Sequence, residues 1–144
     1  MKIAIGSDHA AYGLKAELKR RLSELGHEVE DVGTESEASC DYPDFAELVG
    51  RAVGEGRAER GVLVCGTGIG MSIAANKIPG VRAAVVTDPL TCEMSRKHND
   101  ANVFCAGARV LPGARIAELL EGWLRTPFEG GRHQARVDKI RRLE

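Results

Sequence analysis

The sequence has little of what marks proteins that bind nucleic acids or membranes. The chain contains 20 Lys and Arg residues and 21 Asp and Glu residues, so its net charge is −1. Such a chain has no basic excess to attract a nucleic acid or an anionic bilayer. No apolar run approaches the ~18 residues of a membrane span, and residues 1–6 are too short for a secretory signal. The composition predicts a soluble, cytoplasmic protein without a nucleic-acid or membrane partner.

Cysteine and histidine are scarce and lack the spacing of a disulfide framework or a metal site. No Cys-x-x-Cys pair occurs, and 144 residues can build a core without disulfides. We therefore expect free thiols in a reducing compartment. The histidines add no metal-ligand spacing, so no metal is expected. The cysteines are Cys40, Cys65, Cys92 and Cys105, and the histidines are His9, His27, His98 and His133.

Short β-branched runs alternate with longer amphipathic runs, which is typical of repeated strand–helix–strand units. Domains commonly have ~100–150 residues, so residues 1–144 are treated as one domain. The predicted strands are residues 2–6, 28–32, 61–65, 83–87 and 103–106. The second is polar enough for a sheet edge, whereas the apolar third is typical of a central strand. The pattern predicts an α/β fold with a parallel sheet.

Several residues mark where the helices begin, end and face the core. Gly26 is a C-terminal stop for the first long helix, and Asp88-Pro89 can cap and start another. A helix beginning at Pro43 carries an apolar stripe, and a basic helix from about Arg132 ends the chain. The stripe is Phe45, Leu48, Val49, Ala52 and Val53, and the apolar residues of the basic helix are Val137 and Ile140.

The strongest local signal is the glycine-rich segment Cys65–Gly70, where the third strand turns into a helix. Open parallel sheets bind ligands at the carboxyl ends of their strands. Glycines there let backbone N–H groups converge on an anion, and the helix N-terminus adds positive potential. No Gly-Lys-Ser/Thr follows, and Met71 replaces the last small residue of a dinucleotide fingerprint. The segment predicts an anion site, unless the glycines serve only close helix packing.

Cys65 lies at the carboxyl end of the third strand, facing the start of that helix. A helix N-terminus favours the thiolate, which could then act as a nucleophile or a general base. An ordinary buried thiol is the alternative. Cys40, Cys92 and Cys105 have no comparable setting and are interpreted as structural.

Two further segments carry groups that can transfer protons. Asp8 and His9 follow the first strand, where they could exchange protons or bind a phosphate, but Asp8 could equally be only a helix cap. The His98-Asn99-Asp100 segment directly precedes the fifth strand, so it is expected at the opposite end of the sheet from Cys65. His98 is either a surface residue at a helix end or a group that reaches a neighbouring subunit.

Arg132 and Arg136 are one helical turn apart, so both guanidinium groups project from the same face. Such a pair suits a phosphate dianion, and Arg109 after the fifth strand could be a third contact. The alternative is a solvated basic helix, since the whole C-terminal segment is basic.

Five segments in the same order together resemble the ribose-5-phosphate isomerase B family, which includes isomerases of allose and galactose 6-phosphates. They are GSDHA at 6–10, DYPD at 41–44, CGTGIGMSIAANK at 65–77, RKHNDANV at 96–103 and EGGRHQARV at 129–137. The resemblance covers essentially the whole chain. It implies a three-layer α/β/α sandwich with a five-stranded parallel sheet, in agreement with the periodicity.

The resemblance implies an aldose–ketose isomerase of the pentose phosphate pathway. It would interconvert D-ribose 5-phosphate and D-ribulose 5-phosphate through a cis-enediolate, without metal or organic cofactor. Cys65 would be the general base. Another subclass places a glutamate six positions later, where this chain has Met71, which cannot move a proton. Thr67 and the backbone of the glycine loop would stabilise the enediolate. The loop positions are Gly66, Thr67, Gly68, Ile69 and Gly70.

The remaining roles also come from the resemblance. His98 and Asp8 match positions that open the sugar ring, and Tyr42 and Asn99 match substrate contacts. The positions that match phosphate binding are His9, Arg109, Arg132 and Arg136. The family forms a homodimer or a dimer of dimers, and each site is shared across the interface.

Two alternatives stay open at this point. An isomerase of a hexose phosphate such as allose 6-phosphate differs only in pocket size, which motifs do not decide. A non-catalytic module that binds sugar phosphates is the alternative from another class, although binding alone needs neither Cys65 nor His98.

Overall fold

The computed structural model describes residues 1–144 and contains one five-stranded parallel sheet in the order β2-β1-β3-β5-β4. The strands are β1 (Lys2–Ser7), β2 (Glu28–Asp31), β3 (Arg60–Cys65), β4 (Ala83–Val85) and β5 (Val103–Gly107). The polar β2 lies at an edge and the apolar β3 at the centre, as the sequence predicted.

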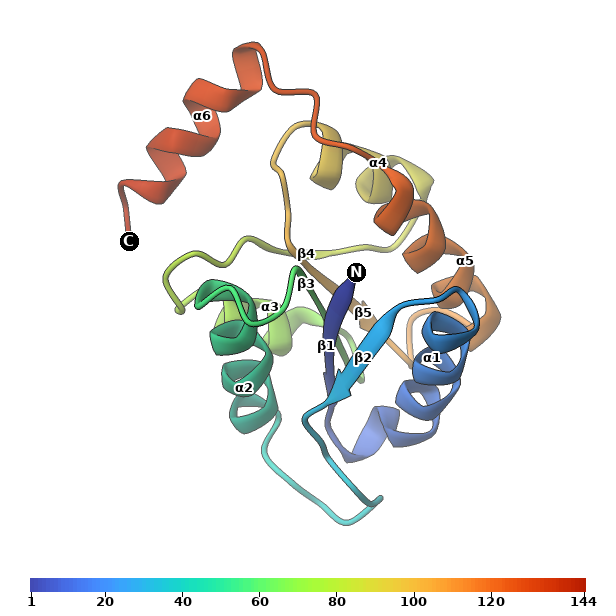
Figure 1. Ribbon diagram of the computed structural model, residues 1–144. Helices are drawn as coiled ribbons and strands as arrows, with labels where there is room; N and C mark the ends of the chain where they lie inside the picture. The colour runs from blue at the N-terminus through green and yellow to red at the C-terminus, as the bar shows by residue number, and fades with distance from the viewer.

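Helices cover both faces of the sheet, so the fold is the expected three-layer α/β/α sandwich (Figure 1). α2 (Tyr42–Gly54) and α3 (Ile69–Ala75) lie on one face, and α1 (Tyr12–Glu24), α4 (Pro89–Lys97) and α5 (Gly113–Arg125) lie on the other. A short 3-10 helix, His9–Ala11, precedes α1. No helix has both the length and the apolar character needed to cross a membrane.

Successive strand residues alternate between two hydrophobic clusters, one on each face of the sheet. In β3, Val62 and Val64 join the cluster beneath α1 and α5. Leu63 and Cys65 join the cluster beneath α2 and α3, which also contains Met71. This alternation places the Cys65 thiol on the same face as α3, the helix that follows it.

The predicted helix ends are confirmed. Gly26 has a φ of 89° directly after the α1 C-cap, a left-handed conformation that glycine adopts without strain. Asp88 caps α4 by accepting a hydrogen bond from the Thr91 backbone N–H at 2.8 Å, and Pro89 begins the helix.

One stripe residue of α2 is misplaced by the sequence prediction. Leu48 is 47% exposed, whereas Ala46 is fully buried. The buried face follows Ala46, Val49 and Val53 at helical spacing, so Leu48 points away from it.

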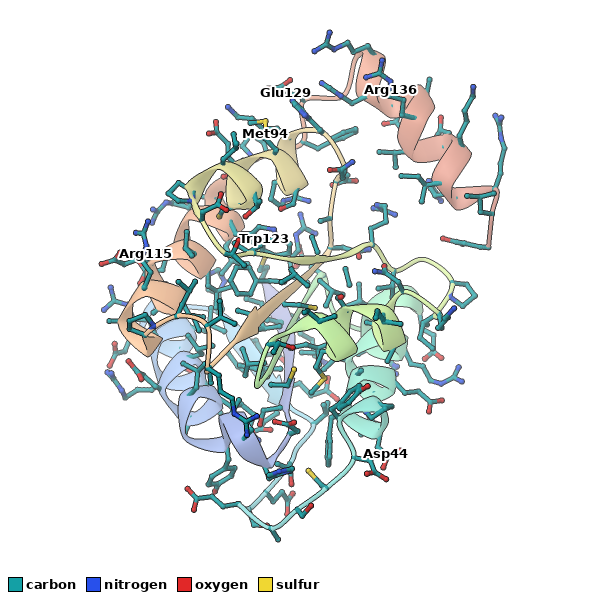
Figure 2. All side chains as sticks on the ribbon, turned by 180° about the vertical axis from the view of Figure 1, so that it is seen from behind. Asp44, Met94, Arg115, Trp123, Glu129 and Arg136 are labelled. Carbon is teal, nitrogen blue, oxygen red and sulfur yellow. The ribbon has the colours of Figure 1, made fainter.

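The C-terminal helix α6 (Arg132–Arg141) stands away from the sheet, as Figures 1 and 2 show. Only His133 and Val137 of this helix are buried. The expected apolar contact of Ile140 is therefore wrong, since this residue is 44% exposed. α6 contributes little to the core of its own chain and presents most of its basic surface to the outside.

Candidate active site

Loops that follow β1, β3 and β5 converge at the carboxyl edge of the sheet. The Asp8 backbone N–H donates to the Val64 carbonyl at 3.4 Å, which holds the loop after β1 against the end of β3. The Arg109 backbone N–H donates to the Gly66 carbonyl at 3.0 Å, which holds the loop after β5 against the glycine loop. The structure therefore brings Asp8, Cys65 and Arg109 to one place, as expected from the parallel sheet.

Cys65 is the last residue of β3, and its thiol lies beneath the glycine loop with 5% exposure. The Gly68 backbone N–H donates a hydrogen bond to Sγ at 3.1 Å. Gly68 has a φ of 79°, so the chain turns over the sulfur and begins α3 at Ile69. The structure thus places the Cys65 sulfur directly beneath the glycine loop at the carboxyl edge of the sheet.

Gly107 at the end of β5 lets the glycine loop lie directly on the neighbouring strand. A Cβ atom at this position would lie 2.5 Å from Thr67 Cα and 2.7 Å from the Gly66 carbonyl oxygen. Both are backbone atoms, so no side chain can rotate away to make room. Sequence reasoning missed this glycine, although its position at the end of a buried strand was a usable signal.

Replacing Gly107 by alanine is expected to displace the glycine loop and lower kcat/KM about a hundredfold, since misplacement by ~1 Å can have this effect. Stability should fall by roughly 1–3 kcal/mol from overpacking. Initial rates and thermal denaturation measure the two effects.

Gly122→Ala is the matched control, because a Cβ there meets no atom within 4 Å. Gly122 lies inside α5, so the control should raise stability by about 0.5–1 kcal/mol without changing the rate. An unchanged rate in Gly107→Ala would contradict the packing argument.

Tyr42, at the start of α2, lies against the first turn of α3. A Cβ atom at Gly70 would come within 2.5 Å of Tyr42 Cζ and 2.8 Å of its hydroxyl oxygen. Gly70 therefore makes room for the phenol, which is 40% exposed and can meet a ligand above the loop. Thr67 of the glycine loop is also exposed, and its Oγ1 accepts from the Ile69 backbone N–H at 3.2 Å. The Thr67 hydroxyl hydrogen is then available to donate to a bound molecule.

Asp8 and His9 lie beside this loop in different settings. Asp8 does cap the short helix, since its carboxylate accepts from the Ala10 backbone N–H at 3.0 Å, and it is 7% exposed. His9 Nδ1 accepts the Cys40 backbone N–H at 3.2 Å. This bond places the proton of a neutral imidazole on Nε2, so His9 is held as a hydrogen-bond donor. The sequence offered no sign that Cys40 would lie beside His9.

Two other cysteines remain protonated thiols. Burial raises the pKa of Cys92 to about 11, and its Sγ donates to the Leu119 carbonyl at 3.1 Å. Burial and the neighbouring Cys65 raise the pKa of Cys105 far above its ordinary value. Both therefore fit the structural interpretation, unlike Cys65.

His98 lies at the opposite end of the sheet from Cys65, as the sequence predicted. It ends α4 just before β5, and β5 runs from there to Gly107, which pairs with Cys65. The His98 ring stacks on the His133 ring of α6, with centroids 4.1 Å apart and planes inclined by 14°. His133 Nε2 lies 3.5 Å from a carboxylate oxygen of Glu129. Burial of His133 and the neighbouring His98 lower the pKa of His133.

His98, Glu129 and His133 place three possible metal ligands within 4.8 Å of one another, a cluster that the sequence spacing did not reveal. The two imidazole planes are almost parallel. A metal ion in the plane of one ring would therefore lie outside the plane of the other, whereas imidazole nitrogen binds metals in the ring plane. The cluster forms a stacked pair with a carboxylate neighbour and does not suit a shared ion.

The beginning of α6 lies beside His98 because of this stacking. Arg132 and Arg136 are exposed one turn apart on α6, and Figure 2 shows Arg136 on the part of the molecule far from Asp44 of α2. Asn99 is also exposed. The predicted residues therefore form two groups, one around Cys65 and one around His98, which a single chain does not bring together.

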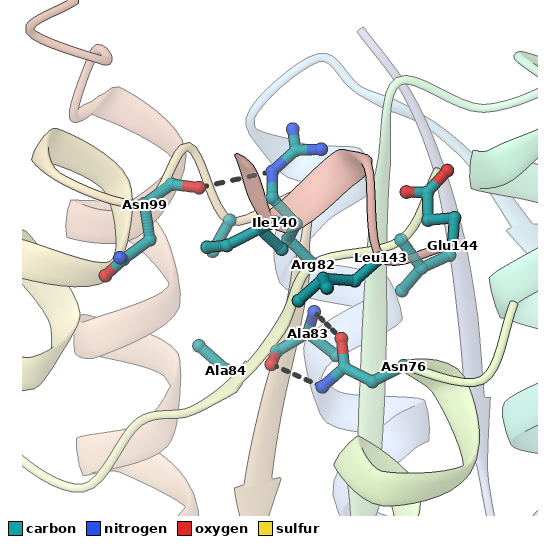
Figure 3. Close-up of a pocket in the computed structure, with 10 residues that line it drawn as sticks. Asn76, Arg82, Ala83, Ala84, Asn99, Ile140, Leu143 and Glu144 are labelled. Carbon is teal, nitrogen blue, oxygen red and sulfur yellow. Dashed lines mark hydrogen bonds between the residues drawn. The ribbon is translucent and has the colours of Figure 1, made fainter. Parts of the chain in front are cut away.

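A hollow of about 450 Å³ lies between β4 and the end of α6 (Figure 3). Its charged groups are already bonded within the chain: Arg82 Nε donates to the Asn99 carbonyl at 3.2 Å, and the Glu144 carboxylate accepts from the Gly80 backbone N–H at 2.9 Å. It contains neither a thiol nor an acid–base pair, so we assign no chemistry to it.

The protein has an α/β fold of the class that binds small ligands at the carboxyl edge of a parallel sheet, where the Cys65 group lies. A family model described as Ribose/Galactose Isomerase matches residues 3–140. The chain belongs to this family, which confirms the resemblance found in the sequence.

Relatives of known name or structure agree with this membership. The chain is 47% identical to ribose-5-phosphate isomerase B of Escherichia coli over 144 residues, which cover 99% of this chain and 96% of the relative. Ribose-5-phosphate isomerase B of Clostridium thermocellum shares 50% identity with a TM-score of 0.98, covering 99% and 97% of the two chains. The Mycoplasma genitalium enzyme, solved with bound ribulose 5-phosphate, shares 40% identity with a TM-score of 0.95, covering 99% and 95%.

Proposed function

We propose that the protein interconverts D-ribose 5-phosphate and D-ribulose 5-phosphate. The observation that carries this proposal is the Cys65 thiol, which lies under a loop of backbone donors and accepts the Gly68 N–H. Membership of the ribose/galactose isomerase family and the similarity to proteins named ribose-5-phosphate isomerase B support it. The substrate is thus a small sugar phosphate.

In this mechanism Cys65 is the base that moves one proton. The thiolate takes the proton from C2 of the open-chain aldose, and the electrons shift to the carbonyl oxygen on C1, forming a cis-enediolate. The thiol then returns the proton to C1, while the hydroxyl proton on O2 passes to O1 and the carbonyl forms at C2. Backbone N–H groups of residues 66–70 and the Thr67 hydroxyl stabilise the enediolate charge. Met71 is fully buried in the core, which supports Cys65 as the base.

The other site residues open the ring and hold the phosphate. His98 and Asp8 act as the acid and base at the ring oxygen and the anomeric hydroxyl. His9 donates from Nε2 to the phosphate. The arginines that form charge-assisted hydrogen bonds with the same phosphate are Arg109, Arg132 and Arg136. Tyr42 and Asn99 contact the sugar.

These roles require a homodimer, alone or as half of a dimer of dimers. His98 and α6 lie far from Cys65 in one chain, so the complete site combines the Cys65 group of one subunit with the His98 group of its partner. α6 stands off its own core, which suits an arm that reaches a second copy. Ile69 and Ile73 on α3 are 55% and 58% exposed beside the glycine loop, and a subunit interface would cover them.

We also propose that residues 1–144 act as one domain in the cytoplasm. One sheet runs through the structure. All four cysteines are free, which suits a reducing compartment.

The test is the initial rate of ribulose 5-phosphate formation from ribose 5-phosphate in excess EDTA, with allose 6-phosphate in parallel. We expect a fast rate on the pentose that EDTA does not reduce. A rate only on the hexose would keep the chemistry and change the substrate. Binding of both sugar phosphates without turnover would instead favour the non-catalytic module.

A further inference from the structure

The turn that carries His98 adopts a conformation that needs support. Asp100 has a φ of 46°, and no other residue besides glycine has a positive φ in this structure. Aspartate tolerates this left-handed region better than most residues, but the conformation remains unfavourable without stabilising contacts. The position of His98, two residues earlier, therefore depends on what holds Asp100.

Two arginines from different elements grip the Asp100 carboxylate. Arg96 Nη1 lies 2.9 Å from one oxygen, and Arg82 Nη2 lies 3.3 Å from the other. Arg82 Nε also donates to the carbonyl oxygens of Asn99, at 3.2 Å, and Asp100, at 3.0 Å; Figure 3 shows the bond to Asn99. Both the side chain and the backbone of the turn are thus fixed.

Arg96 connects this turn to the segment that leads into α6. It is 3% exposed, and its guanidinium lies 5.5 Å from the Trp123 ring centroid. Nη1 donates to the Ala101 carbonyl at 2.6 Å, and Nε donates to the Thr126 carbonyl at 3.1 Å. One buried side chain therefore joins the turn after α4 to the start of the segment between α5 and α6, the segment that leads to His133.

The charge around Asp100 makes its carboxylate hard to replace. Arg60, Arg82 and Arg96 lie close enough to influence one another. Burial lowers the pKa of Arg60, the positive charge of Arg96 lowers it further, and Asp100 opposes this effect. Without the Asp100 charge the three guanidinium groups repel one another, and the bonds of Arg82 to the turn weaken.

We propose that Asp100, held by Arg82 and Arg96, is a positioning residue for sugar-ring opening, because it fixes the His98–Asn99 turn against the start of α6. This inference rests on the proposed function and adds a residue to it. Asp100 need not touch the substrate. It acts through His98, so its loss should impair ring opening more than proton transfer at C2 and C1.

Ring opening can be measured apart from isomerisation. Ribose 5-phosphate is mostly cyclic, whereas ribulose 5-phosphate lacks the free hydroxyl that would close a five-membered ring. An enzyme that cannot open the ring uses only sugar that opens unaided. Its rate from ribose 5-phosphate therefore stops rising with enzyme concentration, while its rate from ribulose 5-phosphate keeps rising. His98→Asn serves as the reference variant for this behaviour.

For Asp100→Asn, which keeps a residue tolerant of positive φ, we expect at least about a tenfold smaller slope of the ribose 5-phosphate rate at high enzyme concentration. The ribulose 5-phosphate rate should stay within about twofold of the unsubstituted protein. Asp100→Gly also permits this backbone conformation, so its two rates should change in the same way as those of Asp100→Asn. Glu93→Gln, which breaks the Glu93–Lys97 pair on the same α4, is the control and should change neither rate.

The outcomes separate the positioning role of Asp100 from the ring-opening role of His98. A plateau in His98→Asn with an unchanged slope in both Asp100 variants would overturn the positioning role alone. No plateau in His98→Asn would overturn the ring-opening role of His98, and the positioning role with it. An equal loss of both rates in the Asp100 variants would show a general structural role and overturn the inference. Thermal denaturation of each variant establishes that it is folded.

Discussion

Replacing Cys65 by alanine should lower kcat from ribose 5-phosphate by about a hundredfold to ten-thousandfold, the range that a general base contributes. Neither Met71 nor Cys105 can take over, because Met71 has no acid–base chemistry and burial keeps Cys105 protonated. Initial rates measured in EDTA from both sugars test this expectation. The rates from ribose 5-phosphate and from ribulose 5-phosphate should fall by the same factor, since proton transfer between C2 and C1 is common to both directions.

Cys105→Ala is a matched control for the Cys65 substitution. Cys105 is fully buried in the same hydrophobic cluster, so both variants lose a sulfur atom from the same core. The stability losses should be similar, roughly 1 kcal/mol by thermal denaturation. Only the Cys65 variant should lose the rate. A Cys65→Ala protein that kept turnover near that of the unsubstituted protein would falsify the mechanism.

Mixing two inactive variants should restore activity if the site is shared between subunits. One variant is Cys65→Ala, and the other is the double variant Arg132→Ala/Arg136→Ala. The double variant should lose about a hundredfold or more at low substrate concentration, since it lacks two charge-assisted hydrogen bonds to the phosphate. After unfolding and refolding together, the mixture should show about a quarter of normal activity, because half of the dimers are mixed and each contains one intact site.

The matched control mixes two variants with lesions in the same half of the site. Cys65→Ala combined with Gly107→Ala should restore nothing, since each glycine loop and thiol come from one chain. Restoration in this control, or its absence in the first mixture, would contradict the arrangement in which the Cys65 group of one subunit meets the α6 of the other. Size-exclusion chromatography with light scattering measures the assembly in both mixtures.

The fold was predictable because its signals are local. Alternating strands and helices, the glycine after α1 and the Asp88-Pro89 start of α4 depend on neighbouring residues and are confirmed. Leu48 was mispredicted because helical spacing alone does not specify which of two adjacent apolar strips of α2 meets the sheet, and Ile140 because α6 stands away from the sheet. That choice depends on how the helix packs.

The site was predictable only in part, since its contacts join distant segments. The pairing of a strand end with a glycine turn was visible around Cys65, and the separation of His98 followed from its place before β5. The contact of Gly107 with Thr67, 40 residues earlier in the numbering, was not visible. Neither was the grip of Arg82 and Arg96 on Asp100, because arginines and aspartates at such spacings usually face solvent.

The detached α6 separates folding from catalysis. Only His133 and Val137 of α6 are buried in its own chain. One chain can therefore complete its core while the arginines of α6 remain exposed to solvent. Under the proposed division of the site between two copies, activity is a bimolecular property of the protein. Below the dissociation constant of the dimer, the rate should vary with the square of protein concentration, although every chain remains folded. Dilution would then switch the enzyme off without denaturing it.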